Sequence, residues 1–247
     1  MPNLLNTCTS HSGNRDFNHC SNCRLSGICL PLSLEFSDID RLDAIVQKGK
    51  PLQKGEILYR SGDDFTAIYA IRSGAIKTWQ TSREGEIQIT GFHLAGEVIG
   101  LDGPATNRLS NSAQALQTTS VCAIPFSKLE SLSRQVPGLQ RNLLQLLSRE
   151  ITSEQRHFGL LGHASADTRV AALLLSLSAR HERHNLSATR FTLPMSRGDM
   201  ANFLGLTLET VSRVFSRMQK QQVITACGKE LEILDSTALH NLAHHSD

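Results

Sequence analysis

The chain has 247 residues and a mass of 27.1 kDa, which suits two domains of ordinary size. Hydrophobic residues make up 40% of it, enough for real cores, and no uncharged apolar run of about 18 residues is present that could span a bilayer. The formal net charge of +2 neither demands nor excludes nucleic acid as a partner.

The first 30 residues are polar, contain cysteine and histidine, and show no helical period. They lack a basic start followed by an apolar run, so we expect no secretion signal and a cytosolic protein. In that compartment clustered cysteines indicate metal or redox chemistry more often than disulfides.

Four cysteines stand out, three in a C-x2-C-x5-C run and one far downstream in an apolar stretch: Cys20, Cys23, Cys29 and Cys122. Three clustered thiolates and one remote thiolate complete a four-sulfur set, which suits either an iron–sulfur cluster or zinc. His11 and His19 lie close enough in the sequence to keep a Cys3His zinc site open as well. The spacing therefore predicts a metal site without choosing the metal, and Cys8 and Cys227 are expected to be free.

Residues 31–136 contain short β-rich segments separated by recurring glycines. Examples are Ile57–Tyr59, Ile68–Ile71, Ala75–Trp79 and Ile87–Thr90. Short strands at such a spacing, each ended by a turn residue, predict an all-β barrel or roll. We therefore expect a β-roll sensor domain here, preceded by a cysteine-rich metal-binding segment over residues 1–30.

The pattern becomes helical after Pro137. Six positions that step by three and four residues form one narrow seam: Leu144, Leu147, Ile151, Glu154, Phe158 and Leu161. A seam this narrow favours a dimerisation helix over residues 137–163 that pairs with its own copy. Packing of the same face against the chain's own β-roll is the alternative.

Residues 164–247 are expected to form a second domain. The segment Gly162–Asp167 is typical of a hinge. Ser165 or Asp167 would cap a helix from Thr168 to about Arg180, whose body of alanine and leucine should be buried.

Two short helices joined by a turn follow in this domain. Ser196–Asp199 resembles a capping box that opens the first helix, Gly205 ends it, and Thr207 offers the N-cap of the second, Leu208–Lys220. The inner stripe of the second helix is predicted to be Val211, Val214, Phe215 and Met218. Residues 223–234 predict a β-hairpin, so the whole domain is expected to be a winged helix-turn-helix.

The second helix presents polar side chains suited to the major groove. The residues expected to contact DNA are Thr207, Glu209, Ser212, Arg213, Ser216, Arg217 and Lys220. Arg213 could contact the O6 and N7 atoms of guanine, and Glu209 could accept from the amino group of cytosine. Arg217 and Lys220 are better placed for phosphates. A helical hairpin with a merely solvated polar face is the alternative.

Six motifs occur together in this chain: Cys20–Cys29, Ala70–Lys77, Gln88–Gly96, Ala113–Leu116, Val121–Pro125 and Leu204–Arg213. With them the chain resembles the FNR-type oxygen sensors of the Crp/Fnr transcription regulators, from Cys20 to about residue 235. The resemblance implies an α+β protein with a β-roll like a cyclic-nucleotide-binding domain, a long dimerisation helix and a winged helix-turn-helix.

The resemblance also implies that the four matching cysteines hold a [4Fe–4S] cluster when oxygen is absent. Oxygen converts such a cluster to [2Fe–2S], the dimer dissociates and the affinity for DNA falls. The family's base-reading residues match Glu209, Ser212 and Arg213. The implied target is a palindrome of the TTGAT-N4-ATCAA kind in double-stranded DNA. Contact with RNA polymerase, and activation or repression of genes of anaerobic metabolism, are implied as well.

Other functions find less support in the sequence. Cyclic-nucleotide-binding relatives present an Arg-Ser pair to the ligand phosphate, whereas Asn111-Ser112 stands here, so we expect no cyclic nucleotide. An enzyme that uses the cluster as a cofactor is disfavoured, because four cysteines leave no open iron and no nucleophile motif lies nearby. A zinc-stabilised DNA-binding protein without sensing stays open. We expect no membrane partner.

Overall fold

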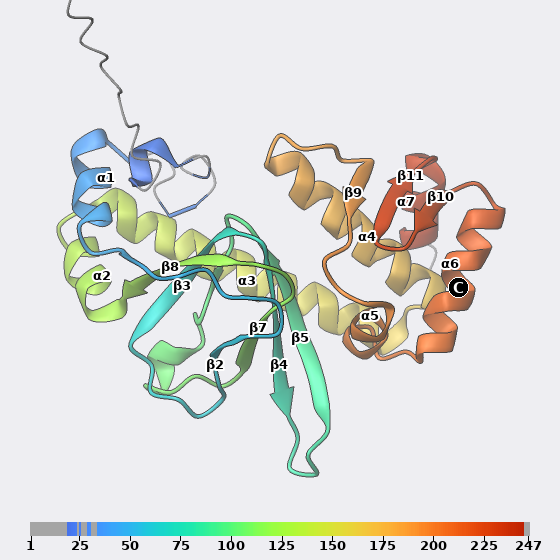
Figure 1. The fold of residues 1–247 in the computed structure, drawn as a ribbon, viewed down its shortest axis with the longest axis horizontal. Coiled ribbons are helices and arrows are strands. Elements are labelled where there is room, and N and C mark those ends of the chain that lie inside the picture. The colour runs from blue at the N-terminus through green and yellow to red at the C-terminus, as the bar shows by residue number, and fades with distance from the viewer. Residues whose placement is uncertain (1–18, 24, 26–28, 31–33, 245–247) are drawn as a thin grey trace, which may run out of the picture.

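The computed structural model describes residues 19–23, 25, 29–30 and 34–244 (Figure 1). In Figure 1 the long helix α3 (Pro137–His163) runs from an N-terminal β-domain on the left to a C-terminal domain on the right. None of the helices in these ranges is long and apolar enough to cross a membrane. The predicted order of β-roll, long helix and helix-turn-helix is therefore confirmed.

Two four-stranded antiparallel sheets form the N-terminal domain, with strand orders β1-β8-β3-β6 and β2-β7-β4-β5. Their strands are β1 Gln47–Lys48, β2 Ile57–Tyr59, β3 Ala67–Ser73, β4 Ala75–Thr81, β5 Ile87–Leu94, β6 Val98–Ile99, β7 Ser112–Ala115 and β8 Ser120–Pro125. A short 3-10 helix, η2 (Gly103–Ala105), separates β6 from β7. Ile71 of one sheet and Ile76 of the other are buried in the same core, so the sheets face each other.

The turn between β3 and β4 depends on Gly74. Its φ of +87° lies in the left-handed region, which favours glycine. A Cβ atom at this position would lie only 2.3 Å from Oγ1 of Thr119. The two sheets can therefore be joined this closely only if residue 74 has no side chain.

Helices α1 (Phe36–Asp43) and α2 (Phe126–Ser133) cover one end of the β-roll together with the start of α3. A second buried cluster lies beneath them and includes Leu42, Leu129 and Leu139. The beginning of α3 is therefore part of the N-terminal domain's core.

Helix α4 (Ala166–Arg183) begins earlier and ends later than predicted. Of the two predicted caps, Ser165 is the N-cap, because its side chain accepts a hydrogen bond from the backbone N–H of Thr168. Asp167 therefore lies inside the first turn. The predicted burial of the helix body is confirmed for residues such as Leu174.

The helix-turn-helix consists of α5 (Arg197–Phe203) and α6 (Leu208–Lys220). Ser196 and Asp199 form the predicted capping box, Thr207 is the N-cap of α6, and the predicted inner stripe is buried. The predicted hairpin is present as β10 (Ile224–Cys227) and β11 (Glu230–Ile233), and α7 (Ser236–His244) follows it. A third strand that was not predicted, β9 (Arg190–Thr192), pairs with β11.

Candidate metal site and nucleic-acid interface

The four cysteines of the predicted metal site come from two parts of the chain. Cys20 begins the short 3-10 helix η1 (Cys20–Asn22), and Cys122 lies in β8. The thiols of Cys20, Cys23 and Cys29 each interact electrostatically with the thiol of Cys122. The fold thus brings the remote cysteine toward the clustered ones.

The four thiols are of a chemical type that suits a metal, although they are not arranged around one. Within the described residues, no group of three or more His, Cys, Asp and Glu side chains is arranged to hold a metal ion, so the metal site stays a prediction. Burial raises the pKa of Cys20 and of Cys29 to about 12, and it also raises the pKa of Cys122. Thiols in such surroundings carry protons until a metal displaces them, and four soft sulfur donors match iron–sulfur clusters or zinc.

Asp43 of α1 anchors the first cysteine. Its Oδ1 accepts a hydrogen bond from the backbone N–H of Cys20 at 2.9 Å and pairs with Nζ of Lys48 at 2.8 Å. Partial burial works to raise the pKa of Asp43, but hydrogen bonds from Lys48 and Cys20 outweigh it and lower that pKa. The carboxylate therefore stays charged and holds the cysteine segment against α1.

His19 was a possible zinc ligand from its position in the sequence. Its Nδ1 lies 2.7 Å from Oγ of Ser21, and its Nε2 lies 3.4 Å from Oδ2 of Asp43. Both ring nitrogens therefore have protein partners, which disfavours His19 as a ligand.

Leu30 links the cysteine segment to the long helix. This side chain, next to Cys29, is only 2% exposed and belongs to the buried cluster that contains Leu139 of α3. Nδ2 of Asn142, one turn further along α3, donates a hydrogen bond to the backbone oxygen of Leu30 at 3.1 Å. The residue that follows Cys29 is thus in contact with the start of α3.

The predicted seam of α3 is partly exposed. Leu144, Ile151 and Phe158 follow one another at intervals of seven residues, and their exposed fractions are 62%, 56% and 80%. Glu154 is also exposed, whereas Leu147 and Leu161 are half-buried. Three large apolar side chains in one row are typical of a surface that a partner covers. The alternative, packing against the chain's own β-roll, is not observed for these three residues.

The predicted base-reading residues of α6 are all exposed. Arg213 and Glu209 lie 3.4 Å apart as an i,i+4 pair at the surface. The hydroxyls of Ser212 and Ser216 donate to backbone oxygens four residues earlier, at 2.8 Å and 3.0 Å. Each hydroxyl oxygen keeps lone pairs that can accept hydrogen bonds from the edge of a base. Glu209, Ser212, Arg213 and Ser216 thus share one exposed polar face of α6, and their predicted contacts with bases stay a prediction.

Thr207 and Arg217, also predicted to contact DNA, have partners within the chain. The hydroxyl of Thr207 accepts from the backbone N–H of Thr210 at 3.1 Å, and so caps α6. Nε and Nη2 of Arg217 donate to the carboxylate of Asp167 at 2.9 Å and 2.5 Å. Arg217 also lines a shallow hollow on α6 together with Arg213 and Lys220.

Arg169 organises the hinge, a role that was not predicted. It donates hydrogen bonds to the backbone oxygens of Leu161 at the end of α3, Ala164 in the hinge and Leu204 after α5. The distances are 3.1 Å, 2.9 Å and 3.0 Å in that order. An arginine in the first turn of a helix rich in alanine and leucine was the available signal, because a partly buried guanidinium needs several acceptors.

Asn111 occupies the place where cyclic-nucleotide-binding relatives present arginine. Its Oδ1 accepts a hydrogen bond from the hydroxyl of Tyr59 at 3.1 Å, and its Nδ2 lies 3.3 Å from Oδ2 of Asp102. Asp102 also accepts from the backbone and hydroxyl of Ser110. Both polar atoms of the Asn111 amide thus have partners within the chain, one of them a carboxylate.

Family comparisons cover both domains. The model of the cyclic nucleotide-binding domain matches residues 50–136, and the model of the Crp-like helix-turn-helix domain matches residues 168–242. The transcriptional activator protein FnrA of Stutzerimonas stutzeri is 52% identical over 225 residues, which cover 91% of this chain and 92% of that protein. The fumarate and nitrate reduction regulatory protein of Escherichia coli K12 is 42% identical, with 92% and 91% covered.

Solved structures share the architecture. FixK2 from Bradyrhizobium japonicum has a TM-score of 0.73 and 30% identity, and the match covers 82% of this chain and all of that one. A transcriptional regulator of the CRP/FNR family from Thermus thermophilus has a TM-score of 0.64 at 19% identity, covering 81% of this chain and 100% of that one. The second likeness concerns the fold alone.

Proposed function

Because this chain belongs to the Crp/Fnr family of transcription regulators, we propose that it is an oxygen-sensing regulator of the FNR and Anr type. Family membership makes it a DNA-binding transcription regulator rather than an enzyme. The proposed regulator works in the cytoplasm and controls genes of anaerobic metabolism, by activation or repression, through contact with RNA polymerase.

The approach of four thiols from two distant parts of the chain is the observation that carries the sensing proposal. A [4Fe–4S] cluster bound by Cys20, Cys23, Cys29 and Cys122 would supply the reactivity toward oxygen. The protein's own part is to fix these cysteines to the fold. Asp43 holds the segment at Cys20, and the burial of Leu30 holds it beside Cys29.

A structural change in the cysteine segment, caused by loss of the cluster, is proposed to alter the dimer interface through α3. Leu30 packs in the core with the start of that helix and accepts a hydrogen bond from Asn142. The exposed row of Leu144, Ile151 and Phe158 lies further along the same helix. A change at Cys29 therefore reaches the surface on which two copies would pair, and the intact site favours the homodimer.

The dimer is proposed to bind a palindrome of the TTGAT-N4-ATCAA kind, with one α6 in each half-site. Glu209, Ser212 and Arg213 would contact bases. The same exposed face also carries Ser216, Arg217 and Lys220, which would contact DNA beside them and help to position the helix. No cyclic nucleotide is proposed, because Asp102 stands beside Asn111 where a phosphate would have to bind.

Replacement of Cys122 by serine tests the assignment. We expect anaerobically purified Cys122→Ser to lose its iron and its affinity for the palindrome, because three thiolates cannot complete the set. Cys227→Ser is the matched control, since that thiol is exposed in the wing, and it should keep both properties. Iron analysis and the visible absorption spectrum under anaerobic conditions are the measurements.

Two outcomes would contradict the proposal. A Cys122→Ser protein with an undiminished iron content would remove Cys122 from the ligand set. A wild-type protein that is colourless and contains zinc would show that the four cysteines bind a structural metal and do not sense oxygen.

A further inference from the structure

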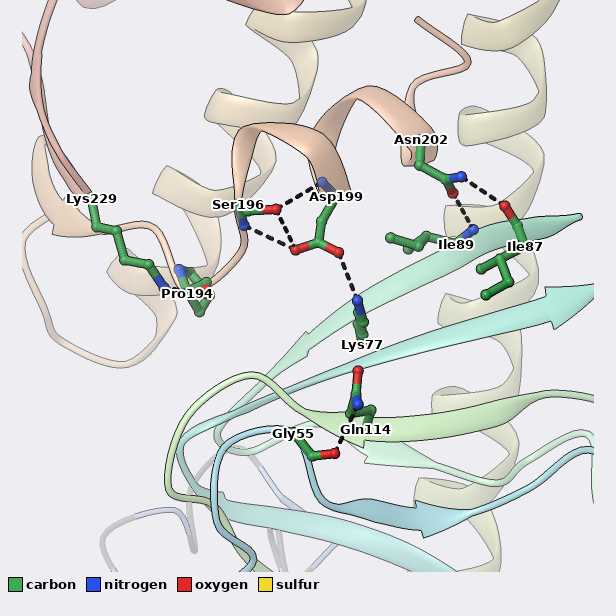
Figure 2. Close-up of polar contacts among 10 residues, drawn as sticks. All are labelled: Gly55, Lys77, Ile87, Ile89, Gln114, Pro194, Ser196, Asp199, Asn202 and Lys229. Atoms are coloured by element: carbon green, nitrogen blue, oxygen red, sulfur yellow. Dashed lines mark hydrogen bonds and ion pairs between the residues drawn. The ribbon is translucent and has the colours of Figure 1, made fainter. Parts of the chain in front are cut away.

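Strand β5 lies at the edge of its sheet, and Asn202 of α5 covers that edge (Figure 2). The side chain of Asn202 accepts a hydrogen bond from the backbone N–H of Ile89 at 2.6 Å and donates one to the backbone oxygen of Ile87 at 2.7 Å. Gln88 returns a hydrogen bond to the backbone oxygen of Asn202 at 2.8 Å. One amide side chain thus takes the place of a neighbouring strand on an otherwise open edge.

An ion pair joins the same two elements. Nζ of Lys77 on β4 lies 2.7 Å from Oδ1 of Asp199, the residue whose other oxygen closes the capping box with Ser196 (Figure 2). Both side chains of the pair are about four-fifths buried, so water screens the attraction less than at an open surface. The contact therefore reaches the N-terminus of α5, while Asn202 reaches its C-terminal turn.

Apolar packing continues between these polar contacts. Ile89 and Phe92 of β5 belong to the same buried cluster as the core of the helix-turn-helix domain. The ring of Phe203 lies between two others, 5.1 Å from Phe92 and 4.0 Å from His157 of α3. We call this set of contacts, made by Lys77, Ile87, Ile89, Phe92, Asp199, Asn202 and Phe203, the β5–α5 interface.

We infer that the β5–α5 interface sets the direction in which α6 points from the dimer helix, and that Asn202 is the positioning residue that decides which half-site spacing the dimer accepts. The inference rests on the proposed function, since it assumes that two copies bind one palindrome. Asn202 touches no base in this role. It acts by holding α5, and α6 packs on α5.

The physical argument concerns rigidity. Two recognition helices bind one palindrome well only if their separation matches the spacing of the half-sites. The chain between α3 and α4 is a short hinge, so without further contacts the helix-turn-helix could turn about it. An interface with hydrogen bonds, an ion pair and a buried core removes that freedom before DNA binds. Its loss should weaken binding at the correct spacing and relax discrimination against wrong ones.

The experiment measures the DNA affinity of anaerobically purified wild type and Asn202→Ala. Three palindromes are used, one with the four-base-pair spacer, one with a spacer of three base pairs and one with a spacer of five. One base pair moves a half-site by about 3.4 Å and rotates it by roughly a tenth of a turn. We expect Asn202→Ala to reduce the affinity ratio between best and displaced spacers by roughly tenfold. Asn241→Ala, the same substitution at an exposed position of α7, is the matched control and should keep the wild-type ratio.

A second measurement needs no DNA. Lys77 is not the partner of the Ile89 amide, so the exchange rate of that amide in Lys77→Ala reports whether the two surfaces separate. We expect exchange roughly tenfold faster than in Lys128→Ala, a control at an exposed lysine of α2.

An unchanged spacer ratio in Asn202→Ala would overturn the inference. Failure of every variant and of the wild type to bind any of the palindromes would instead contradict the proposed function. Equal Ile89 exchange rates in Lys77→Ala and Lys128→Ala would overturn the inference whatever the result with DNA, because the β5–α5 interface would then not depend on the ion pair.

Discussion

The side chain of Arg213 makes one weak ion pair in the free protein. Its guanidinium is 77% exposed and pairs only loosely with Glu209, at 3.4 Å. A surface pair of this kind is worth little, so breaking it costs little when a base replaces the carboxylate. Arg217 differs, because its guanidinium makes two short hydrogen bonds to Asp167. The two arginines of α6 therefore suit different tasks.

Replacement of Arg213 by alanine should cost about 1–3 kcal/mol of binding free energy at the cognate palindrome. The loss of a base contact should also relax the preference for one base pair in each half-site. Lys220→Ala is the control, since a phosphate contact should weaken all sequences alike and reduce the salt dependence. The measurement is a set of binding isotherms on cognate and singly substituted sites at two salt concentrations. If Arg213→Ala lost the same affinity on all sites, Arg213 would contact the phosphate backbone of the DNA and not a base.

Glu150 of α3 carries an unfavourable charge. Burial, with the nearby charges of Glu154 and Glu97, raises the pKa of Glu150 from 4.5 to about 6, against the effect of Arg180. The folded protein therefore binds a proton at this carboxyl more tightly than the unfolded chain does. Stability that is present below pH 4.5 is lost as the pH rises through 6.

We predict that Glu150→Gln stabilises the fold by roughly 1–2 kcal/mol at neutral pH. The gain should shrink as the pH falls through 6 and should vanish below pH 4.5, where the Glu150 carboxyl of the wild type is protonated in both the folded and the unfolded chain. Thermal unfolding across this pH range is the measurement. Glu182→Gln, an exposed position of α4, should leave the pH dependence as in wild type. A stabilisation by Glu150→Gln that did not change with pH would argue against this origin.

At the scale of elements, α3 combines two surfaces with different requirements. Its beginning packs in the core of the N-terminal domain through Leu139, whereas Ile151 and Phe158 further along are exposed. Glu154 lies between these two positions and is also exposed. In a parallel pair two Glu154 carboxylates would face each other, and like charges would oppose association. The dimer would thus stand close to its dissociation midpoint.

Glu154→Ala should therefore dimerise and bind DNA even in air. Ile151→Ala should do the reverse, because it removes apolar area from the same surface, and it should give an anaerobic monomer that retains its iron. Gln155→Ala, at an exposed position beside the seam, is the control. Sedimentation of the aerobic proteins decides, and a monomeric Glu154→Ala protein would place Glu154 outside the dimer contact.

Elements with local signals were predictable from the sequence. The capping box at Ser196 and the N-cap at Thr207 are each contained in a few residues, and both helices begin where these residues indicate. Strand β9 was missed because its three residues, Arg190–Thr192, are too few to show alternation and depend on β11 for pairing. Local patterns thus predicted these two helices better than this short strand.

At the scale of the whole molecule, contacts between distant residues escaped prediction. Lys77 and Asp199 are separated by 122 positions, and each alone is an ordinary charged residue. Asn202 carries no local signal for a contact with β5, since its role depends on a sheet edge that only the folded chain creates. The four-cysteine metal site, in contrast, has a local signal, because three of its cysteines lie within ten residues of one another, and it stays a prediction.

The buried cluster that contains both β5 and the helix-turn-helix has a consequence for how such regulators can recombine. A DNA-binding domain taken from a relative and joined at the hinge would meet Ile89, Phe92 and Lys77 with a differently shaped α5. Its apolar surface would be left imperfectly covered, and its helices would point in another direction. We therefore expect the N-terminal and DNA-binding domains of this chain not to exchange as independent modules unless β5 and α5 are exchanged together.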